Sequence, residues 1–138
     1  EVHDENGLRR GRYRWHAGLF GDAVAVASFG NDWLHHSQER FGISATLANT
    51  AIRLQAETGA ERRGLGWMLK SESNSSAGDL FSTSSYGHTG FTGTSLWIDP
   101  FRNLVVALLT NRVYYGRDRE GIHAVRRAVH DAIAASVG

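Results

Sequence analysis

The chain has 138 residues, of which 41% are hydrophobic and 10% aromatic, which is enough for one modest core but not for two independent domains. Fifteen basic residues against 14 acidic ones leave no overall field that would attract nucleic acid or an anionic membrane, and this argues against both as partners. Cysteine is absent, which excludes disulfides and thiolate sites, and no apolar run approaches the roughly 20 residues that a transmembrane helix needs.

The first part of the chain predicts a loop and two helices. Residues 1–14 are polar and show no sustained hydrophobic period, which indicates a loop. Asp22 and Ser44 are candidate N-caps, because their side-chain oxygens can accept hydrogen bonds from the first unpaired N–H groups of a helix. Apolar residues recur at helical spacing after each of them, so we expect helices over 22–37 and 44–57.

The second part of the chain predicts strands and one last helix. Short segments at 64–69, 86–98 and 104–110 have the composition of strands, and the serine-rich stretch 71–85 predicts a loop. The last two strands flank an Asp-Pro turn and should form a hairpin. A final helix is expected over 118–137, with one apolar stripe that packs across the hairpin, made of Ile122, Val125, Val129, Ile133 and Val137.

This order of elements predicts an α+β fold with a three-stranded antiparallel sheet. We expect residues 1–138 to be one portion of a single domain, with the loop and helices in 1–60, the strands in 64–113 and the last helix in 118–137. Residues 104–109 are so uniformly apolar that both faces of their strand should be covered, as in a wider sheet. We therefore expect further strands or helices of the same domain, from sequence outside these residues, as a partner of this strand.

One segment carries a recognisable motif. Residues 86–100 read Tyr-Gly-His-Thr-Gly-Phe-Thr-Gly-Thr-Ser-Leu-Trp-Ile-Asp-Pro, and an apolar strand ending in Thr-Asn-Arg follows. This segment resembles the third-motif strand and its successor in class C β-lactamase-like serine hydrolases, a superfamily that includes D-alanyl-D-alanine carboxypeptidases and esterases. The segments 2–6, 16–20 and 64–67 resemble the same family in the same order. The resemblance implies that the chain is the C-terminal portion of a single β-lactamase/transpeptidase-like domain.

The resemblance also implies roles for four consecutive residues. In the family, the backbone amide after the third-motif glycine helps to form the oxyanion hole, and that residue corresponds to Phe91. Gly90 would let substrate backbone lie against the strand, and Thr89 would offer a hydroxyl to a substrate carboxylate or carbonyl. His88 stands where many relatives carry lysine, and its imidazole could supply hydrogen bonds and a pH-dependent positive charge. Without the resemblance, Gly90 and Gly93 could simply mark a bend, and His88 could be an ordinary polar edge residue.

The nucleophile and its base are missing from these residues. The resemblance implies attack by the serine of a Ser-x-x-Lys motif, whose lysine helps to deprotonate it, and a second Tyr-x-Asn or Ser-x-Asn motif. Lys70 is the only lysine, and Trp67 stands three positions before it. No tyrosine or serine has asparagine two positions later. Both motifs would therefore lie upstream of Glu1, and the 138 residues alone are predicted to be inactive.

We therefore expect an intact serine hydrolase that acts through an acyl-enzyme on β-lactam, D-Ala-D-Ala peptide or ester substrates, and no cofactor is implied. The alternatives are a catalytically inactive relative that binds peptide or cell-wall fragments and a purely structural interaction domain. Residues 2–6 together with His16 could suggest a metal site, but no paired ligand spacing supports one. Relatives often occur in the bacterial periplasm or cell envelope, and this location is an expectation from the family alone.

Overall fold

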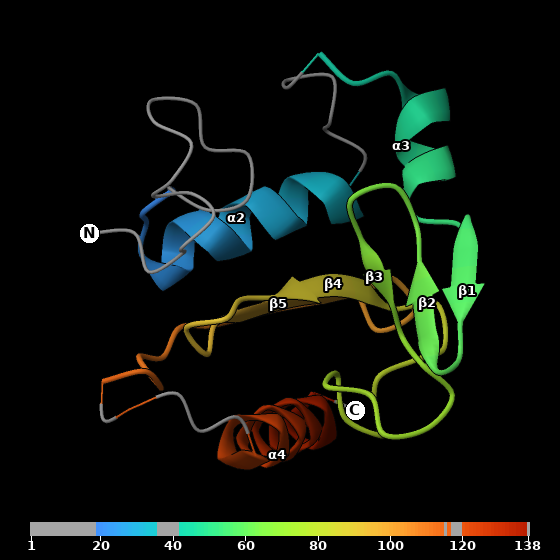
Figure 1. Ribbon diagram of the computed structural model, residues 1–138. Helices are drawn as coiled ribbons and strands as arrows, with labels where there is room; N and C mark the ends of the chain where they lie inside the picture. The colour runs from blue at the N-terminus through green and yellow to red at the C-terminus, as the bar shows by residue number, and fades with distance from the viewer. Residues whose placement is uncertain (1–18, 36–41, 115, 117–119, 138) are drawn as a thin grey trace, which may run out of the picture.

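The computed structural model describes residues 19–35, 42–114, 116 and 120–137, in which a sheet lies between helices (Figure 1). Helix α2 covers one face of the sheet, and helix α4 lies on the other. The predicted α+β class is confirmed. The elements in chain order are α2 (Ala23–Leu34), α3 (Ala45–Ala51), β1 (Ala56–Thr58), β2 (Glu61–Arg63), β3 (Met68–Leu69), β4 (Tyr86–Thr89), β5 (Ser95–Asp99), β6 (Leu104–Leu108) and α4 (Glu120–Ser136).

The sheet has six strands among the described residues, so the predicted number of three is wrong. Their order in the sheet is the same as their order in the sequence, and every neighbouring pair is antiparallel. Two of the additional strands, β1 and β2, form a hairpin around Gly59, whose φ of 59° suits a tight turn. The predicted strand at 64–69 is reduced to the two residues of β3.

The two predicted N-caps are confirmed, but the second helix is shorter than predicted. Asp22 accepts a hydrogen bond from the Ala25 N–H at 2.8 Å, and Ser44 caps α3 in the same way. In a longer α3, the Ala51 carbonyl would pair with residue 55. That carbonyl instead accepts the Leu65 N–H at 2.8 Å, and the chain after α3 enters β1. A contact between segments this far apart in sequence leaves no trace in a local helical period.

The segment predicted as one strand over 86–98 is a hairpin. Strand β4 ends at Thr89 and strand β5 begins at Ser95, and the Gly90 N–H donates to the Thr94 carbonyl at 2.8 Å across the turn. Gly93 has a φ of 101°, a backbone conformation that favours glycine. The next hairpin, β5–β6, is confirmed as predicted.

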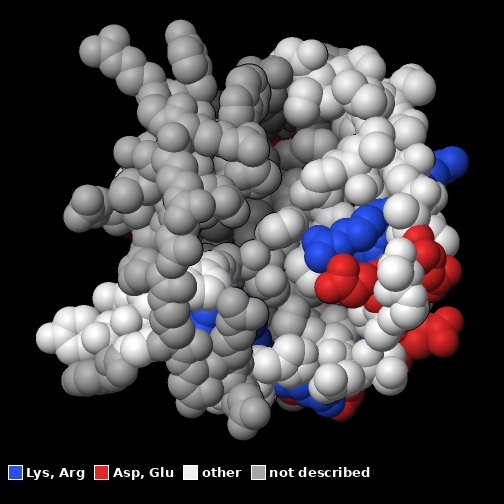
Figure 2. Space-filling model, viewed as in Figure 1, with Lys and Arg blue, Asp and Glu red and all other residues white. Residues whose placement is uncertain are grey.

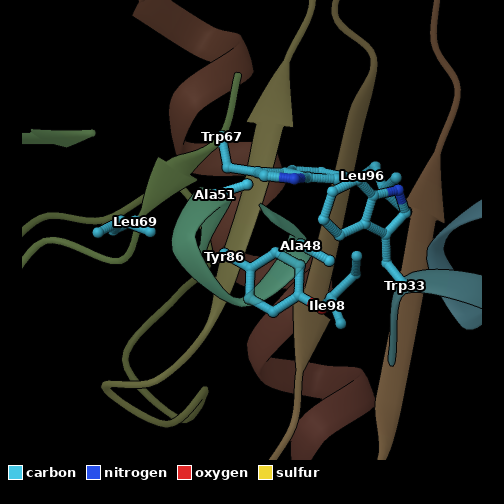
Figure 3. Close-up of a cluster of buried hydrophobic side chains, with 8 residues drawn as sticks. All are labelled: Trp33, Ala48, Ala51, Trp67, Leu69, Tyr86, Leu96 and Ile98. Atoms are coloured by element: carbon cyan, nitrogen blue, oxygen red, sulfur yellow. The ribbon is translucent and has the colours of Figure 1, made fainter. Parts of the chain in front are cut away.

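Aromatic side chains dominate the core between α2 and the sheet (Figure 3). The Trp67 ring lies 5.1 Å from the Trp33 ring and 5.3 Å from the Tyr86 ring, both edge to face. Burial raises the pKa of Tyr86 to about 12, because the phenolate would be poorly solvated there. Gly30 lets α2 approach closely, since a Cβ there would lie 2.7 Å from a methyl of Val105. The buried members of this cluster are Trp33, Ala48, Ala51, Trp67, Leu69, Tyr86, Leu96 and Ile98.

Strand β6 is covered on both faces, as its sequence predicts. Val105 and Ala107 pack against the cluster on the α2 face, whereas Leu104 and Val106 pack on the α4 face with Trp97. None of the described helices is long and apolar enough to cross a membrane.

Only part of the apolar stripe predicted for α4 faces the interior. Val125 and Val137 are exposed, and Arg126, His130 and Ala134 are buried in their place. These three residues are spaced four apart, so they lie on one face of the helix. Helix α4 therefore presents charged and polar groups to the sheet, which a search for apolar periodicity overlooks.

Charges of both signs are interleaved on the side of the molecule formed by β1 and β2. Figure 2 shows basic and acidic side chains next to one another there. Arg62 lies 3.5 Å from Glu57, and Arg63 lies 3.2 Å from Glu61. This face carries no field of one sign that would attract a polyanion.

Candidate functional site

The four predicted site residues lie at the end of β4 and the start of the β4–β5 turn. His88 pairs with Leu96 and therefore projects on the α2 face of the sheet, whereas Thr89 pairs with Ser95 and projects on the α4 face. His88 is exposed, and its Nδ1 lies 2.9 Å from the Thr89 carbonyl oxygen. The Thr89 hydroxyl lies 3.7 Å from the sulfur of Met68.

The turn itself is tightly built around two glycines. The Gly93 N–H donates to the Gly90 carbonyl at 3.1 Å. This bond lies within the turn that the bond from Gly90 to Thr94 closes. A Cβ on Gly90 would lie 2.1 Å from the hydroxyl oxygen of Thr94, and one on Gly93 would lie 2.1 Å from that of Thr110. A side chain at 90 would therefore force the Thr94 hydroxyl to move, whether or not substrate also approaches this position. A larger residue at 90 would disturb the turn before it met any substrate.

Two arginines hold carbonyls of this turn. One terminal nitrogen of Arg126, on α4, donates to the Gly90 carbonyl at 2.8 Å and to the Thr94 carbonyl at 2.7 Å. Arg112, which follows β6, donates from Nε to the Phe91 carbonyl, and its guanidinium carbon lies 4.6 Å from the centre of the Phe91 ring. The turn is thus fixed by two residues that the motif does not contain.

Arg126 is a buried cation. Its side chain reaches the turn through the interior, and only 7% of the residue is exposed. Burial lowers the pKa of Arg126, and the positive charge of Arg112 lowers it further. A guanidinium nevertheless keeps its proton in proteins, so the turn carbonyls face a permanent positive charge.

The adjacent residues of α4 hold the serine-rich loop, here residues 71–85. The Nδ1 of His130 lies 2.8 Å from the Ser76 carbonyl, and one carboxylate oxygen of Asp131 accepts the N–H groups of Asp79 and Leu80 at 2.7 and 2.8 Å. Burial lowers the pKa of His130; the bond to Ser76 opposes this shift. Helix α4 is thus attached both to the loop and to the β4–β5 turn.

The structure brings His88, Thr89, Gly90 and Phe91 together only as consecutive residues of one hairpin. Arg126 and Arg112 were missed, because an arginine within a helix or after a strand has the sequence signature of a solvated residue. The candidate metal ligands in 2–6 and His16 lie outside the described residues. Within the described part of the chain, no group of three or more His, Cys, Asp or Glu side chains could hold a metal ion.

Comparison with known proteins identifies the family. The sequence model of the β-lactamase family matches residues 2–130, so the chain belongs to this family. The fold is also similar to part of a crystallised β-lactamase from Mycobacterium bovis, with a TM-score of 0.68 and 25% identity over 83% of this chain and 43% of that one. The predicted resemblance and the β-lactamase-like fold are both confirmed.

Individual relatives carry names from cell-wall chemistry. The chain is 36% identical over 116 residues to an N-acetylmuramyl-L-alanine amidase of Bacillus subtilis. It is 32% identical over 118 residues to a Salmonella gallinarum protein named as a D-alanyl-D-alanine carboxypeptidase. Each match covers 81% of this chain but only 26% and 27% of the respective relative. The chain thus spans about a quarter of the length of these relatives.

Proposed function

We propose that these residues are the C-terminal portion of the catalytic domain of a serine hydrolase that works through an acyl-enzyme. Their part is to supply the His-Thr-Gly strand and the backbone amide of Phe91 as one donor of an oxyanion hole. The observation that carries the proposal is the β4–β5 turn, in which Arg126 holds the carbonyl of the third-motif Gly90 and Arg112 holds the carbonyl of Phe91. Membership of the β-lactamase family supports it.

The chemistry requires a fixed donor at this position. When a serine oxygen attacks an acyl carbonyl, the carbonyl electron pair moves onto oxygen and a tetrahedral oxyanion forms. A backbone N–H that is already oriented stabilises this charge without reorganising during the reaction. The leaving group then departs with a proton, and water later releases the acyl group from the serine. His88, on the α2 face, would bind the substrate beside this donor, and Thr89, on the α4 face, would contact it at the end of the strand.

The substrate class is proposed from the family and the relatives together. β-Lactams, D-Ala-D-Ala peptides and small esters all offer an acyl carbonyl to a serine nucleophile. The serine and its lysine base would come from sequence outside these 138 residues, which contain no Ser-x-x-Lys. The rest of that domain and the acyl substrate are therefore the proposed partners.

Covalent labelling tests the proposal. The 138-residue chain and a longer form extended upstream through Ser-x-x-Lys and Tyr-x-Asn are each treated with a fluorescent fluorophosphonate and a fluorescent penicillin. We expect labelling of the longer form only, and its loss when the serine of Ser-x-x-Lys is changed to alanine. Labelling of the short chain would contradict the proposal by revealing another nucleophile. Absence of labelling in both forms would favour a binding module without turnover.

A further inference from the structure

We propose that Arg126 is a positioning residue that sets the direction of the Phe91 N–H, an inference that rests on the function proposed above. Arg126 is 36 residues away from Gly90 in sequence and comes from a different layer of the fold. It touches neither the nucleophile nor the substrate in this proposal. It acts through the peptide bond that joins Gly90 to Phe91.

The geometry of that peptide bond carries the argument. The Gly90 carbonyl and the Phe91 N–H belong to one planar trans unit, in which C=O and N–H point in opposite directions. Arg126 donates to the Gly90 oxygen at 2.8 Å from the α4 side. A carbonyl drawn towards α4 turns the N–H of the same unit away from α4. The hydrogen bond therefore fixes the orientation of the proposed oxyanion donor.

The same bond also makes the donor stronger. A cation at the carbonyl oxygen withdraws electron density through the amide, so the N–H at the other end becomes a better hydrogen-bond donor. This effect is larger in a poorly solvated place, and Arg126 is buried. The fixed orientation and the polarisation therefore both make the Phe91 N–H a better donor to the oxyanion.

The turn has a second constraint that prevents a simple rotation. The same Arg126 nitrogen donates to the Thr94 carbonyl at 2.7 Å, on the far side of the turn. Arg112 holds the next carbonyl, that of Phe91, and stacks on its ring. Two successive peptide units on either side of the Phe91 Cα are therefore held by separate cations.

Arg126 can act in this way because α4 is itself fixed. One turn further along the helix, His130 and Asp131 bond the serine-rich loop through Ser76, Asp79 and Leu80. Arg127 points to the same loop, where it contacts Asp79 at 2.9 Å and Asn74 at 2.8 Å. Arg127 bonds this loop and not the turn, so it serves as a matched control on the same helix.

Replacement by methionine removes the cation and keeps most of the buried hydrocarbon. The turn keeps its own bonds in Arg126→Met, since Gly90 oxygen still accepts from Gly93 and Thr94 oxygen from Gly90. The hairpin should therefore remain folded, while the Gly90 carbonyl loses the charged one of its two hydrogen-bond donors and the peptide unit is held less firmly in its direction. Arg126→Lys keeps a positive donor on a shorter side chain and should restore part of the effect.

The first readout is the Phe91 amide itself. The dipeptide Gly-Phe occurs once in the 138 residues, at 90–91. When glycine carries 13C at its carbonyl and phenylalanine carries 15N, only the Phe91 amide has a 13C–15N bond, so its NMR peak is identified directly. We expect this peak to shift in Arg126→Met and to stay in place in Arg127→Met, with the other phenylalanine amides unchanged. A Phe91 peak that does not move in a folded Arg126→Met protein would overturn the inference.

The second readout is turnover in the longer form that carries Ser-x-x-Lys. We expect Arg126→Met to lower kcat for an ester substrate about 10- to 100-fold while KM changes less than about threefold, because loss of a whole oxyanion donor costs about 10²–10³ in kcat. Arg127→Met should keep wild-type kcat, and Arg126→Lys should fall between. Unchanged kcat in folded Arg126→Met would also overturn the inference.

The two proposals fail in different ways. A wild-type longer form that labels with neither probe would overturn the serine hydrolase function. A wild-type form that labels, combined with a stationary Phe91 peak or an unchanged kcat in Arg126→Met, would leave the function in place and remove the role of Arg126.

Discussion

On the α2 face of the sheet the buried side chains are almost all apolar, whereas on the α4 face arginine, histidine and aspartate are buried beside apolar ones. The first face is organised by contacts among the rings of Trp33, Trp67 and Tyr86. The second is organised by hydrogen bonds that Arg126 and His130 make with distant carbonyls. Apolar contacts are non-directional, while hydrogen bonds to a carbonyl specify its direction.

This difference suggests a division of roles between the two faces. Removing an apolar group from the α2 face should lower the free energy of unfolding with little effect on the geometry of the β4–β5 turn. Removing a polar group from the α4 face should cost less stability and alter orientation or pH dependence instead. Four substitutions, taken from the largest expected effect to the smallest, test this division.

Truncation of Trp67 should have the largest effect. Its ring is buried between three other rings, and Trp67→Ala is expected to lower the free energy of unfolding by about 3–5 kcal/mol. Urea denaturation measures this loss. Phe101→Ala serves as the control because Phe101 is 83% exposed, and it should change stability by less than about 0.5 kcal/mol. Equal losses in both variants would contradict the packing described here.

Loss of the Asp99 carboxylate should come next. Asp99 is fully buried, and its oxygens accept from the Ser82 N–H and hydroxyl at 2.7 and 2.6 Å and from the Phe101 N–H at 3.0 Å. Asp99→Asn replaces one accepting oxygen by a donor, and we expect a loss of about 2–3 kcal/mol in the same denaturation assay. Asp79→Asn, at an exposed carboxylate, should cost clearly less. A neutral result at Asp99 would mean that the loop at Ser82 is held in another way.

His130 should give the α4 face a pH dependence. Its pKa is lower in the folded state than the unfolded value of about 6.5. At a pH between these two pKa values, the unfolded chain therefore binds more protons than the folded one. Stability should therefore be complete above pH 6.5 and decline as the pH falls towards the folded pKa. His130→Asn keeps a donor for Ser76 without titrating, and denaturation at several pH values should show a shallower decline. An unchanged slope in His130→Asn would show that another group causes the decline.

The Arg127–Asp79 pair should matter least. Asp79 is largely exposed, with 68% of its side chain accessible, and such pairs contribute about 0.5 kcal/mol or less. Arg127→Met should therefore produce a small loss that shrinks further at high salt, because salt screens exposed charges. Denaturation at two salt concentrations measures it. A loss as large as that of Asp99→Asn would show that the polar α4 face is more important for stability than we propose.

The sequence predicted the elements whose signals are local. Side-chain caps at Asp22 and Ser44, the Asp-Pro turn and the covered strand β6 are each visible within a few residues. The C-terminal end of α3 and the β1–β2 hairpin were missed, because the Leu65 N–H that occupies the Ala51 carbonyl comes from another segment. The motif residues of the site were visible by resemblance. Arg126 was not, since its role depends on the packing of α4 against a turn 36 residues away.

The sequential order of the six strands has a consequence for how these residues fold. Each strand pairs with the one before it, and apart from the serine-rich loop between β3 and β4 each hairpin closes only a short loop, which costs little chain entropy. The contact between His130 and Ser76 instead joins residues 54 apart. Proteins rich in local pairings fold fast, and we expect the sheet to form by successive hairpins, with docking of α4 as the late step. The amide of Phe91 would then reach its final orientation only when the last helix is in place.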